Sequence, residues 1–258
     1  MSPTTDLQGK HALISGGARG IGLAITRLLV QHGARVSVTG RMPQRPELLH
    51  EFTDHGLGYC SMDVCDSQSV KHAFSQARQQ FGAVHILINN AGQAASAPFL
   101  KTDLDLWRRM MDVNLDGTYR VTQAALPDML AVGWGRIVNV ASVAGLVGAP
   151  YISAYCAAKH GIVGLTRALA TELATKGITV NAVCPGYTDT DMVRDALTNI
   201  VFRTGRTHEQ ALAELTARNP QKRLVTPEEV ANAVAWLCLP GSEAITGQAI
   251  TVAGGEVM

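Results

Sequence analysis

The sequence has little charge of either sign and few aromatic residues. Charged residues make up 17% of the 258 residues and aromatic residues 5%, and 22 Lys+Arg against 21 Asp+Glu leave a net charge of +1. A nucleic-acid-binding protein typically carries a basic stripe or a strongly basic domain, so this balance argues against nucleic acid as a partner. With 47% hydrophobic residues, the chain is globular and long enough to bury roughly 75% of its unfolded surface.

The sequence also lacks paired cysteines. Its five cysteines have no CxxC spacing and predict neither a metal site nor a secreted disulfide framework. The N-terminal MSPTTDLQGK has no basic segment followed by an apolar core, so we expect no signal peptide and a cytoplasmic location. The uncharged stretch Ile137–Ala158 contains polar residues and Gly/Pro breaks, which favour a buried strand and a loop over a membrane span.

Short apolar runs rich in β-branched residues alternate with segments of helical period. This pattern predicts an α/β fold, a Rossmann-type doubly wound parallel sheet of about seven strands with helices on both faces. Strands are expected at His11–Ser15, Arg35–Thr39, Leu57–Met62, His85–Asn89, Arg136–Ala141, Ile178–Val183 and Gly247–Val252. Helices are expected at Ile21–His32, Glu47–His55, Ser67–Phe81, Asp103–Ala131 with a kink at Pro127, Ser153–Lys176, and Pro227–Leu239 with a capping box at Thr226.

No linker or repeat divides the chain, so residues 1–258 are expected to form a single domain. The exception in this pattern is the polar stretch Asp189–Arg223, which contains no expected strand. We expect it to form a small helical excursion from the sheet, suited to act as a substrate lid.

A glycine-rich turn follows the first expected strand and opens the first helix. In SGGARGIG (Ser15–Gly22) the glycines allow a tight turn and a close approach to a phosphate, whose charge a helix N-terminus stabilises. The spacing is Gly-x-x-x-Gly-x-Gly, and such a turn alone could be only a tight connection. Its place in a βαβ unit favours a dinucleotide site.

The second expected strand ends without the acidic residue that commonly binds the adenosine ribose. Gly40 stands at that position and Arg41 follows. A guanidinium binds a 2′-phosphate well, so NADP(H) is favoured, with NAD(H) as the alternative. Arg19 could reach the same phosphate; both arginines could also be ordinary solvated loop residues.

Two further strand ends are candidates for cofactor contacts. Asp63 and Val64 follow the third strand, and Asn90, Ala91 and Gly92 follow the fourth. Ligands bind at the carboxyl ends of strands in open α/β sheets. Asp63 could accept a hydrogen bond from adenine, although an Asx turn or a helix cap explains it equally well.

The most specific feature is YCAAK, in which Tyr155 and Lys159 are four residues apart on a predicted helix. Both side chains then lie on one helix face, and a nearby cation stabilises phenolate and lowers the phenol pKa. Tyr155 is therefore a candidate general acid or base. Ser142, just past the fifth strand, and Asn114, in the long helix, lie beside the same expected cleft.

Together these motifs make the whole chain resemble the short-chain dehydrogenase/reductase family. The matches are SGGARGIG, in which Ser15 replaces the usual threonine, NNAG (Asn89–Gly92), Asn114, Ser142, YCAAK and PGYTDT (Pro185–Thr190). The resemblance implies that Tyr155 donates a proton to a carbonyl, Lys159 tunes Tyr155 and binds the cofactor ribose, Ser142 polarises the carbonyl, and Asn114 holds a relay water. It also implies cofactor contacts from Ser15, Gly16, Arg19, Gly20, Ile21, Gly22, Pro185, Gly186, Thr188 and Thr190.

The resemblance is strongest to the β-ketoacyl-thioester reductases. That branch implies a 3-oxoacyl or 3-hydroxyacyl thioester as substrate, carried by CoA or by a carrier protein. Reductases that dock a carrier protein use basic residues before the fifth strand and on the catalytic helix, but Met129–Trp134 has none and Thr171 stands at the helix position. CoA is therefore favoured. A small free ketone or alcohol is the alternative substrate, and a non-catalytic dinucleotide-binding regulator is the alternative function.

The family resemblance also implies a homo-oligomer, most simply a tetramer. Its long helices, Asp103–Ala131 and Ser153–Lys176, would pair across one two-fold axis, and the last strand with Gly254–Met258 would form the other contact. The catalytic helix is apolar or small nearly all round, which fits a second partner besides the sheet. The alternative is a monomer in which the lid covers the apolar side of the catalytic helix that faces away from the sheet.

Overall fold

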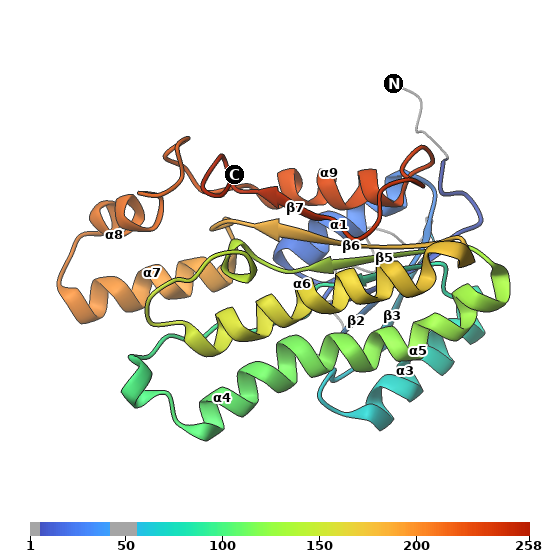
Figure 1. Ribbon diagram of the computed structural model, residues 1–258, viewed down its shortest axis with the longest axis horizontal. Helices are drawn as coiled ribbons and strands as arrows, with labels where there is room; N and C mark the ends of the chain where they lie inside the picture. Colours follow the sequence, from blue (N-terminus) through green and yellow to red (C-terminus); the bar gives the residue numbers. More distant parts are fainter. Residues whose placement is uncertain (1–5, 42–55) are drawn as a thin grey trace.

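Seven parallel strands form one sheet in the spatial order β3-β2-β1-β4-β5-β6-β7. The computed structural model describes residues 6–41 and 56–258. The strands are β1 (His11–Ser15), β2 (Arg35–Gly40), β3 (Leu57–Ser61), β4 (Ile86–Asn89), β5 (Gly135–Val140), β6 (Ile178–Pro185) and β7 (Ala249–Val252). The chain builds outward from β1 to β3 and then crosses back to β4, which is the doubly wound Rossmann arrangement (Figure 1). The predicted fold is confirmed.

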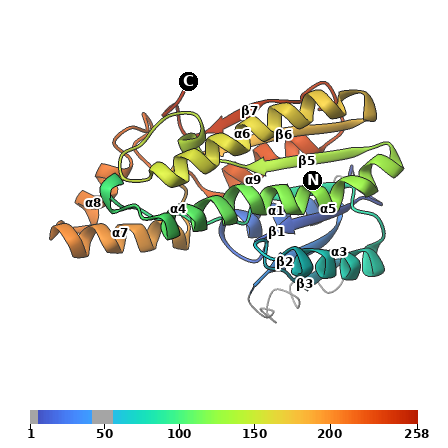
Figure 2. The ribbon, with the colours of Figure 1, turned by 60° about the horizontal axis from the view of Figure 1, so that its bottom comes forward.

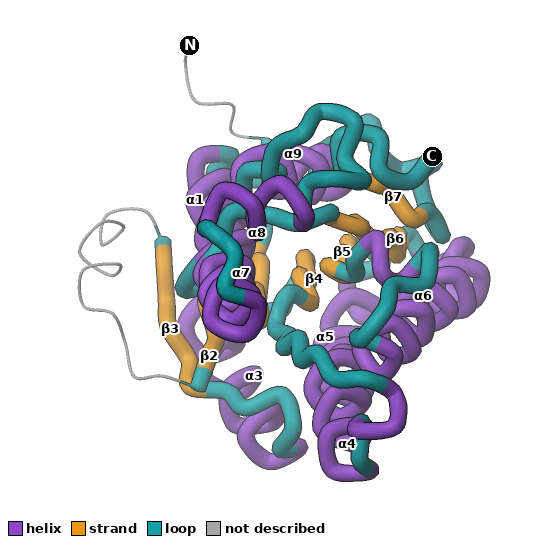
Figure 3. Tube along the Cα trace, turned by 90° about the vertical axis from the view of Figure 1, so that its left-hand side faces the viewer, coloured by secondary structure: helices purple, strands orange, loops and turns teal. Residues whose placement is uncertain are grey.

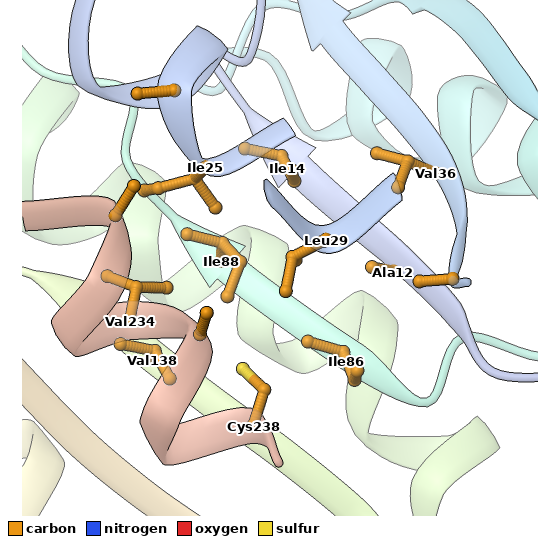
Figure 4. Packing of buried hydrophobic residues seen from close by; sticks show 14 of the residues in the cluster. Ala12, Ile14, Ile25, Leu29, Val36, Ile86, Ile88, Val138, Val234 and Cys238 are labelled. Atoms are coloured by element: carbon orange, nitrogen blue, oxygen red, sulfur yellow. The ribbon is translucent and has the colours of Figure 1, made fainter. Parts of the chain in front are cut away.

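Strands β1, β4, β5 and β6 are buried on both faces, so their side chains enter two cores. Ala12 and Ile14 pack in one cluster and Leu13 in the other, as the alternation of a strand requires. On the first face, α1 (Gly20–Gln31) and α9 (Pro227–Cys238) cover the sheet. Figure 4 shows Ile25 and Leu29 of α1 meeting Ile14 and Ile88, with Val234 and Cys238 of α9 beside them.

The opposite face carries α3 (Ser67–Phe81), α5 (Gly117–Val132) and α6 (Ser153–Leu173). Figure 2 shows α5 and α6 running side by side along the sheet, with α4 (Leu104–Met111) continuing the line of α5. Short 3₁₀ turns cover Phe99–Lys101, Val143–Gly145 and Ala174–Lys176. Asp66 caps the first turn of α3 by accepting a hydrogen bond from the Gln68 N–H.

The long helix predicted over Asp103–Ala131 is interrupted in the structure. A π-helical turn, Asp112–Asp116, separates α4 from α5. Pro127 lies inside α5, which continues to Val132, so the departure from α-helical geometry is not at Pro127. Pro127 is on the exposed side of α5, where water can bind the carbonyl that the proline leaves without a donor. The helix predicted over Glu47–His55 lies outside the described residues.

The stretch predicted as a helical excursion contains α7 (Asp191–Thr204) and α8 (His208–Leu215) and no strand. It leaves and rejoins the domain at a parallel bridge between Thr188 and Val225. Val193, Leu197 and Ala211 form a small core of its own. Figure 3 looks onto the carboxyl ends of the strands, beyond which α7 and α8 project. Among the described residues, no helix combines the length and apolar character that crossing a membrane requires.

Candidate active site

The turn between β1 and α1 has a backbone that only glycine suits. Gly16 and Gly20 have φ values of 67° and 50°, in the left-handed region. A Cβ on Gly22 would overlap the Gly16 carbonyl oxygen and lie 2.6 Å from Asn90 Nδ2. The first turn of α1, which includes Ile21, carries no acidic side chain. This cradle at a helix N-terminus fits the pyrophosphate of a dinucleotide, so the residues present suit the predicted cofactor.

Ser15 and Asn90 hold this turn against the end of β4. Ser15 Oγ accepts hydrogen bonds from the N–H groups of Asn90 and Ala91, each at 3.0 Å. Asn90 Nδ2 donates to the carbonyl oxygens of Ser15 and Gly16, also at 3.0 Å. Both predicted cofactor residues therefore have side chains engaged in shaping the cradle, which explains why a hydroxyl at position 15 is needed.

At the end of β2 a glycine precedes an exposed arginine. Arg41 is exposed and follows Gly40, the last residue of β2, while Arg19 is exposed at the N-cap of α1. Among the described residues, a Cβ on Gly40 would meet Tyr59 Oη alone, at 3.6 Å. Tyr59 itself donates a hydrogen bond to the Gly40 carbonyl oxygen at 2.8 Å. None of Gly40, Arg41 and Tyr59 carries a carboxylate, which would repel a 2′-phosphate.

Asp63 forms the Asx turn that the sequence left as one of its alternatives. Its Oδ1 accepts a hydrogen bond from the Cys65 N–H at 2.9 Å. Val64 is buried, and its carbonyl oxygen accepts a hydrogen bond from Arg120. Position 64 also packs against Gly117, where a Cβ would lie 2.8 Å from Val64 Cγ2. This strand end is thus tied to the first turn of α5.

Asn114 lies in the π-helical turn and is fully buried. Its Nδ2 donates to the carbonyl oxygens of Gln93 and Met110, at 3.0 and 2.9 Å, and its Oδ1 accepts from the Gln93 N–H. A Cβ on Gly92 would lie 2.8 Å from Asn114 Oδ1 and 3.8 Å from Lys159 Nζ. The structure therefore brings the NNAG loop, Asn114 and Lys159 together. π-Helical turns are rare and frequently occur at functional sites.

Lys159 is buried beneath the same region. It is 4% exposed, and its Nζ donates a hydrogen bond to the Val140 carbonyl oxygen at 2.9 Å. Nζ lies 5.6 Å from the centroid of the Tyr155 ring, so the two side chains share one face of α6 as predicted. Burial lowers the pKa of Lys159 to about 8, because removal from water disfavours the ammonium.

The predicted direction of the Tyr155 pKa shift is wrong in this structure. Burial raises the pKa of Tyr155 to about 12, and a hydrogen bond with Ser142 lowers it by a smaller amount. The expected lowering by Lys159 does not appear, since desolvation of the phenol is the largest effect. Ser142 precedes the Val143–Gly145 turn, and its Oγ accepts from the Ala144 N–H at 3.1 Å. Ser142 and Tyr155 are thus direct neighbours.

The PGYTDT segment connects the sheet to the helical excursion. Pro185 ends β6, and the Gly186 N–H donates to the Val252 carbonyl oxygen. The buried Thr188 donates to the Gly186 carbonyl oxygen at 3.0 Å, and Thr190 donates to that of Thr188 at 3.2 Å. A Cβ on Gly20 would lie 3.1 Å from Thr190 Cγ2. The start of α7 therefore lies directly over the glycine turn.

Three contributors were not predicted from the sequence. Gln93 binds Asn114 through its backbone, and the Val140 carbonyl oxygen holds Lys159. Backbone contacts of this kind leave no residue-type signal. Tyr187 lies close enough to Tyr155 to contribute to its raised pKa; its place beside Gly186 in PGYTDT could have pointed to it.

Comparisons with known proteins identify the family. A family model described as enoyl-(acyl carrier protein) reductase matches residues 16–256. The chain belongs to the short-chain dehydrogenase/reductase family. Among its relatives, the D-beta-hydroxybutyrate dehydrogenase of Rhizobium meliloti is 36% identical over 95% of this chain and 98% of that protein. A 3-oxoacyl-[acyl-carrier-protein] reductase of Vibrio cholerae is 37% identical over 98% of this chain and 99% of that protein.

A solved structure extends the comparison to three dimensions. The actinorhodin polyketide ketoreductase, as a single-residue variant with NADPH, superposes with a TM-score of 0.91 at 38% identity, covering 98% of each chain. This short-chain dehydrogenase/reductase is therefore an oxidoreductase that interconverts a ketone and a secondary alcohol with a nicotinamide cofactor.

Proposed function

We propose that this enzyme reduces a 3-oxoacyl thioester to the 3-hydroxyacyl thioester with NADPH, and catalyses the reverse reaction. The observation that carries the proposal is the convergence of Asn114, Ser142, Tyr155 and Lys159 beside the glycine cradle. A dinucleotide-binding regulator would need only the cradle. The ketoreductase and oxoacyl reductase activities of the relatives support the substrate class.

In the proposed mechanism Tyr155 donates its phenolic proton to the carbonyl oxygen of the substrate. The cofactor, when bound, supplies hydride. Ser142 polarises and orients the carbonyl through its hydroxyl, and Lys159, held by the Val140 carbonyl oxygen, places a positive charge beside the phenol. Asn114 holds a relay water in the turn between α4 and α5. Burial raises the pKa of Tyr155, so its phenol carries a proton at neutral pH, and the charge of Lys159 would stabilise the phenolate that remains after the transfer.

The cofactor contacts follow the same proposal. Gly16, Gly20, Ile21 and Gly22 would hold the pyrophosphate, and Arg41 with Arg19 the 2′-phosphate of NADP(H). Asp63, Val64, Ala91 and Gly92 would border the adenosine half. Pro185, Gly186, Thr188 and Thr190 would border the nicotinamide half. NAD(H) is the alternative cofactor.

CoA is the proposed carrier of the acyl chain rather than a carrier protein. Thr171 is exposed on α6, and its hydroxyl donates to the Arg167 carbonyl oxygen, so no cation stands at that position. The same helix does present the exposed Arg167 four residues earlier. A small free ketone or hydroxy acid is the second candidate, favoured by the likeness to a hydroxybutyrate dehydrogenase. A cytoplasmic location, a homotetramer and a lid role for α7 and α8 complete the proposal.

An assay with NADPH and a matched panel tests the reaction. The panel contains acetoacetyl-CoA, the same acyl group on a carrier protein, and free acetoacetate. We expect loss of NADPH absorbance, fastest with the CoA ester. Tyr155→Phe should lose at least about a hundredfold in kcat, the scale of general acid catalysis, while NADPH binding, measured by fluorescence, is retained. NADPH binding without turnover of any panel member would favour the regulator.

The cofactor preference has its own test. Gly40→Asp with Arg41→Leu adds a carboxylate at the end of β2, where a Cβ would lie 3.6 Å from Tyr59 Oη, and removes a cation. The double variant should bind NADH more tightly than NADPH, by up to a few kcal/mol in relative affinity. Isothermal titration with both cofactors measures this without turnover. A wild-type preference for NADH would contradict the assignment of Arg41.

A further inference from the structure

Tyr151 combines a backbone conformation that suits glycine with a side chain that the fold does not bury. Its φ is 66°, and among the described residues only Lys222 shares a positive φ without being glycine. For a bulky residue this conformation is strained and persists where the surroundings enforce it. The Tyr151 ring is nevertheless 65% exposed. The subunit therefore gains little packing from the ring in return for the strain.

The backbone contact at Tyr151 does not need the ring either. The Tyr151 carbonyl oxygen accepts a hydrogen bond from the Ala97 N–H at 2.8 Å, a contact that any residue can make. It joins the loop before α6 to the segment that follows the NNAG motif. Glycine at position 151 would keep this hydrogen bond and remove the strain.

The position of the loop connects the ring to the chemistry. Residues 143–152 run from the catalytic Ser142 to the start of α6, and Tyr155 lies four residues beyond Tyr151. The two segments joined by the Ala97–Tyr151 hydrogen bond carry further apolar side chains in solvent. Phe99 is 72% exposed and Val147 39% exposed. Exposed apolar groups on the loop that connects Ser142 to the helix of Tyr155 are suited to contact a ligand.

The proposed substrate offers an occupant for this surface. Beyond the reacting carbonyl, an acyl substrate continues as an apolar chain that must leave the Ser142–Tyr155 pair in some direction. We propose that the Tyr151 ring contacts this chain and that the enzyme therefore prefers 3-oxoacyl groups with an extended apolar chain. This inference rests on the proposed function and adds a specificity-determining residue to it.

The test compares two substrates that differ only in chain length. Four-carbon and ten-carbon 3-oxoacyl N-acetylcysteamine thioesters carry the same reacting group. Tyr151→Gly should raise KM for the ten-carbon substrate about tenfold and leave KM for the four-carbon substrate within about twofold, the range that apolar contacts provide. kcat should stay unchanged for both. Tyr151→Phe, which keeps the ring, should retain the wild-type KM for both substrates.

Two physical readouts separate a substrate contact from a structural role. The urea midpoint of Tyr151→Gly should equal or exceed that of the wild type, because strain is removed, and sedimentation should be unchanged. A lower midpoint would show that the ring supports the fold, and a changed oligomer that it contacts a second copy; either overturns the inference. So does an unchanged ten-carbon KM. If the wild type reduces neither substrate, the proposed function itself fails.

Discussion

At the scale of single residues, the candidate site depends on how closely the NNAG loop approaches Asn114. Gly92 leaves no space for a methyl group, since its Cβ would lie 2.8 Å from Asn114 Oδ1. Asn114 cannot swing aside freely, because its amide binds Gln93 and Met110. The glycine in NNAG is therefore explained by the packing of a neighbouring side chain and not by its own backbone conformation.

Gly92→Ala should therefore displace Asn114 and slow turnover. We expect kcat to fall about tenfold or more, since misplacement by a fraction of an ångström impairs a positioned group. Steady-state kinetics with NADPH measures the loss. Gly148→Ala is the matched control, because nothing lies within 4 Å of its added Cβ and its φ is not left-handed. Equal activity in the two variants would contradict the packing argument.

The Tyr155 pKa shows where residue-level prediction stops. Spacing alone places Tyr155 and Lys159 on one helix face, and the structure agrees. The direction of the pKa shift depends on how far the phenol is removed from water, and the spacing of Tyr155 and Lys159 in the sequence does not reveal that. Burial raises the pKa of Tyr155 and lowers that of Lys159 at once.

At the scale of elements, β1, β2 and β4 are joined near their amino ends through the buried His11 and the half-buried His85. His11 is 1% exposed; its ring nitrogens contact the Gly82 carbonyl oxygen at 2.9 Å and Ser37 Oγ at 2.8 Å. The His85 Nδ1 accepts a hydrogen bond from the His11 N–H. Burial lowers the pKa of both histidines below 6.5, so both rings are neutral in the folded state at neutral pH.

The free energy of unfolding should therefore decrease as pH falls below about 6.5. In that window the unfolded chain binds protons that the folded histidines do not, so acid favours unfolding. Above pH 6.5 these groups contribute no slope. Urea unfolding from pH 8 to 5 measures the effect, and His11→Asn should show a shallower decrease than the wild type. An identical slope in the variant would contradict the assignment to His11.

The start of α9 is a second element-scale feature, and it was predicted from sequence. The Glu229 N–H donates to Thr226 Oγ1 at 3.2 Å, and the Thr226 N–H donates to Glu229 Oε2 at 2.8 Å. Thr226→Ala should lower the free energy of unfolding by about 1 kcal/mol. Urea titration at fixed protein concentration measures it. Thr198→Ala, inside α7, is the control. It removes a hydroxyl that donates to the Arg194 carbonyl oxygen, and the free energy of unfolding should not change measurably.

The elements that sequence predicts well are those with a local signal. Strand and helix positions follow from periodicity, and the boundaries of α3 and of the β1 strand agree with the structure. The π-helical turn at Asn114 has no such local signal, and the Asn114 side chain is bound by the backbone of Gln93, 21 residues earlier in the chain. The predicted helix is therefore interrupted by a π-helical turn in the structure, although the structure still brings Asn114 close to Lys159. Sequence order supplied the positions, and three-dimensional packing supplied their geometry.

At the scale of the whole molecule, the exposed face of α6 contains small residues between polar ones. Most of the apolar residues that suggested a second partner are buried in the subunit, including Ile162, Val163 and Leu173. What remains exposed includes Gly164 and Ala168, one helical turn apart. On α5, Tyr119 is 50% exposed. Small residues allow a second helix to approach closely, which fits the proposed two-fold contact through α5 and α6.

Gly164→Arg should dissociate that contact without harming the subunit. Nothing lies within 4 Å of a Cβ at position 164, so a single subunit accommodates the side chain, whereas a two-fold interface would receive two guanidinium groups. Sedimentation at micromolar concentration should show an oligomer for the wild type and a smaller species for the variant. Ala213→Arg, exposed on α8, adds the same charge outside both proposed contacts and should sediment like the wild type. A wild-type species near the 27.4 kDa chain mass would refute the oligomer, and an unchanged Gly164→Arg assembly would refute this interface.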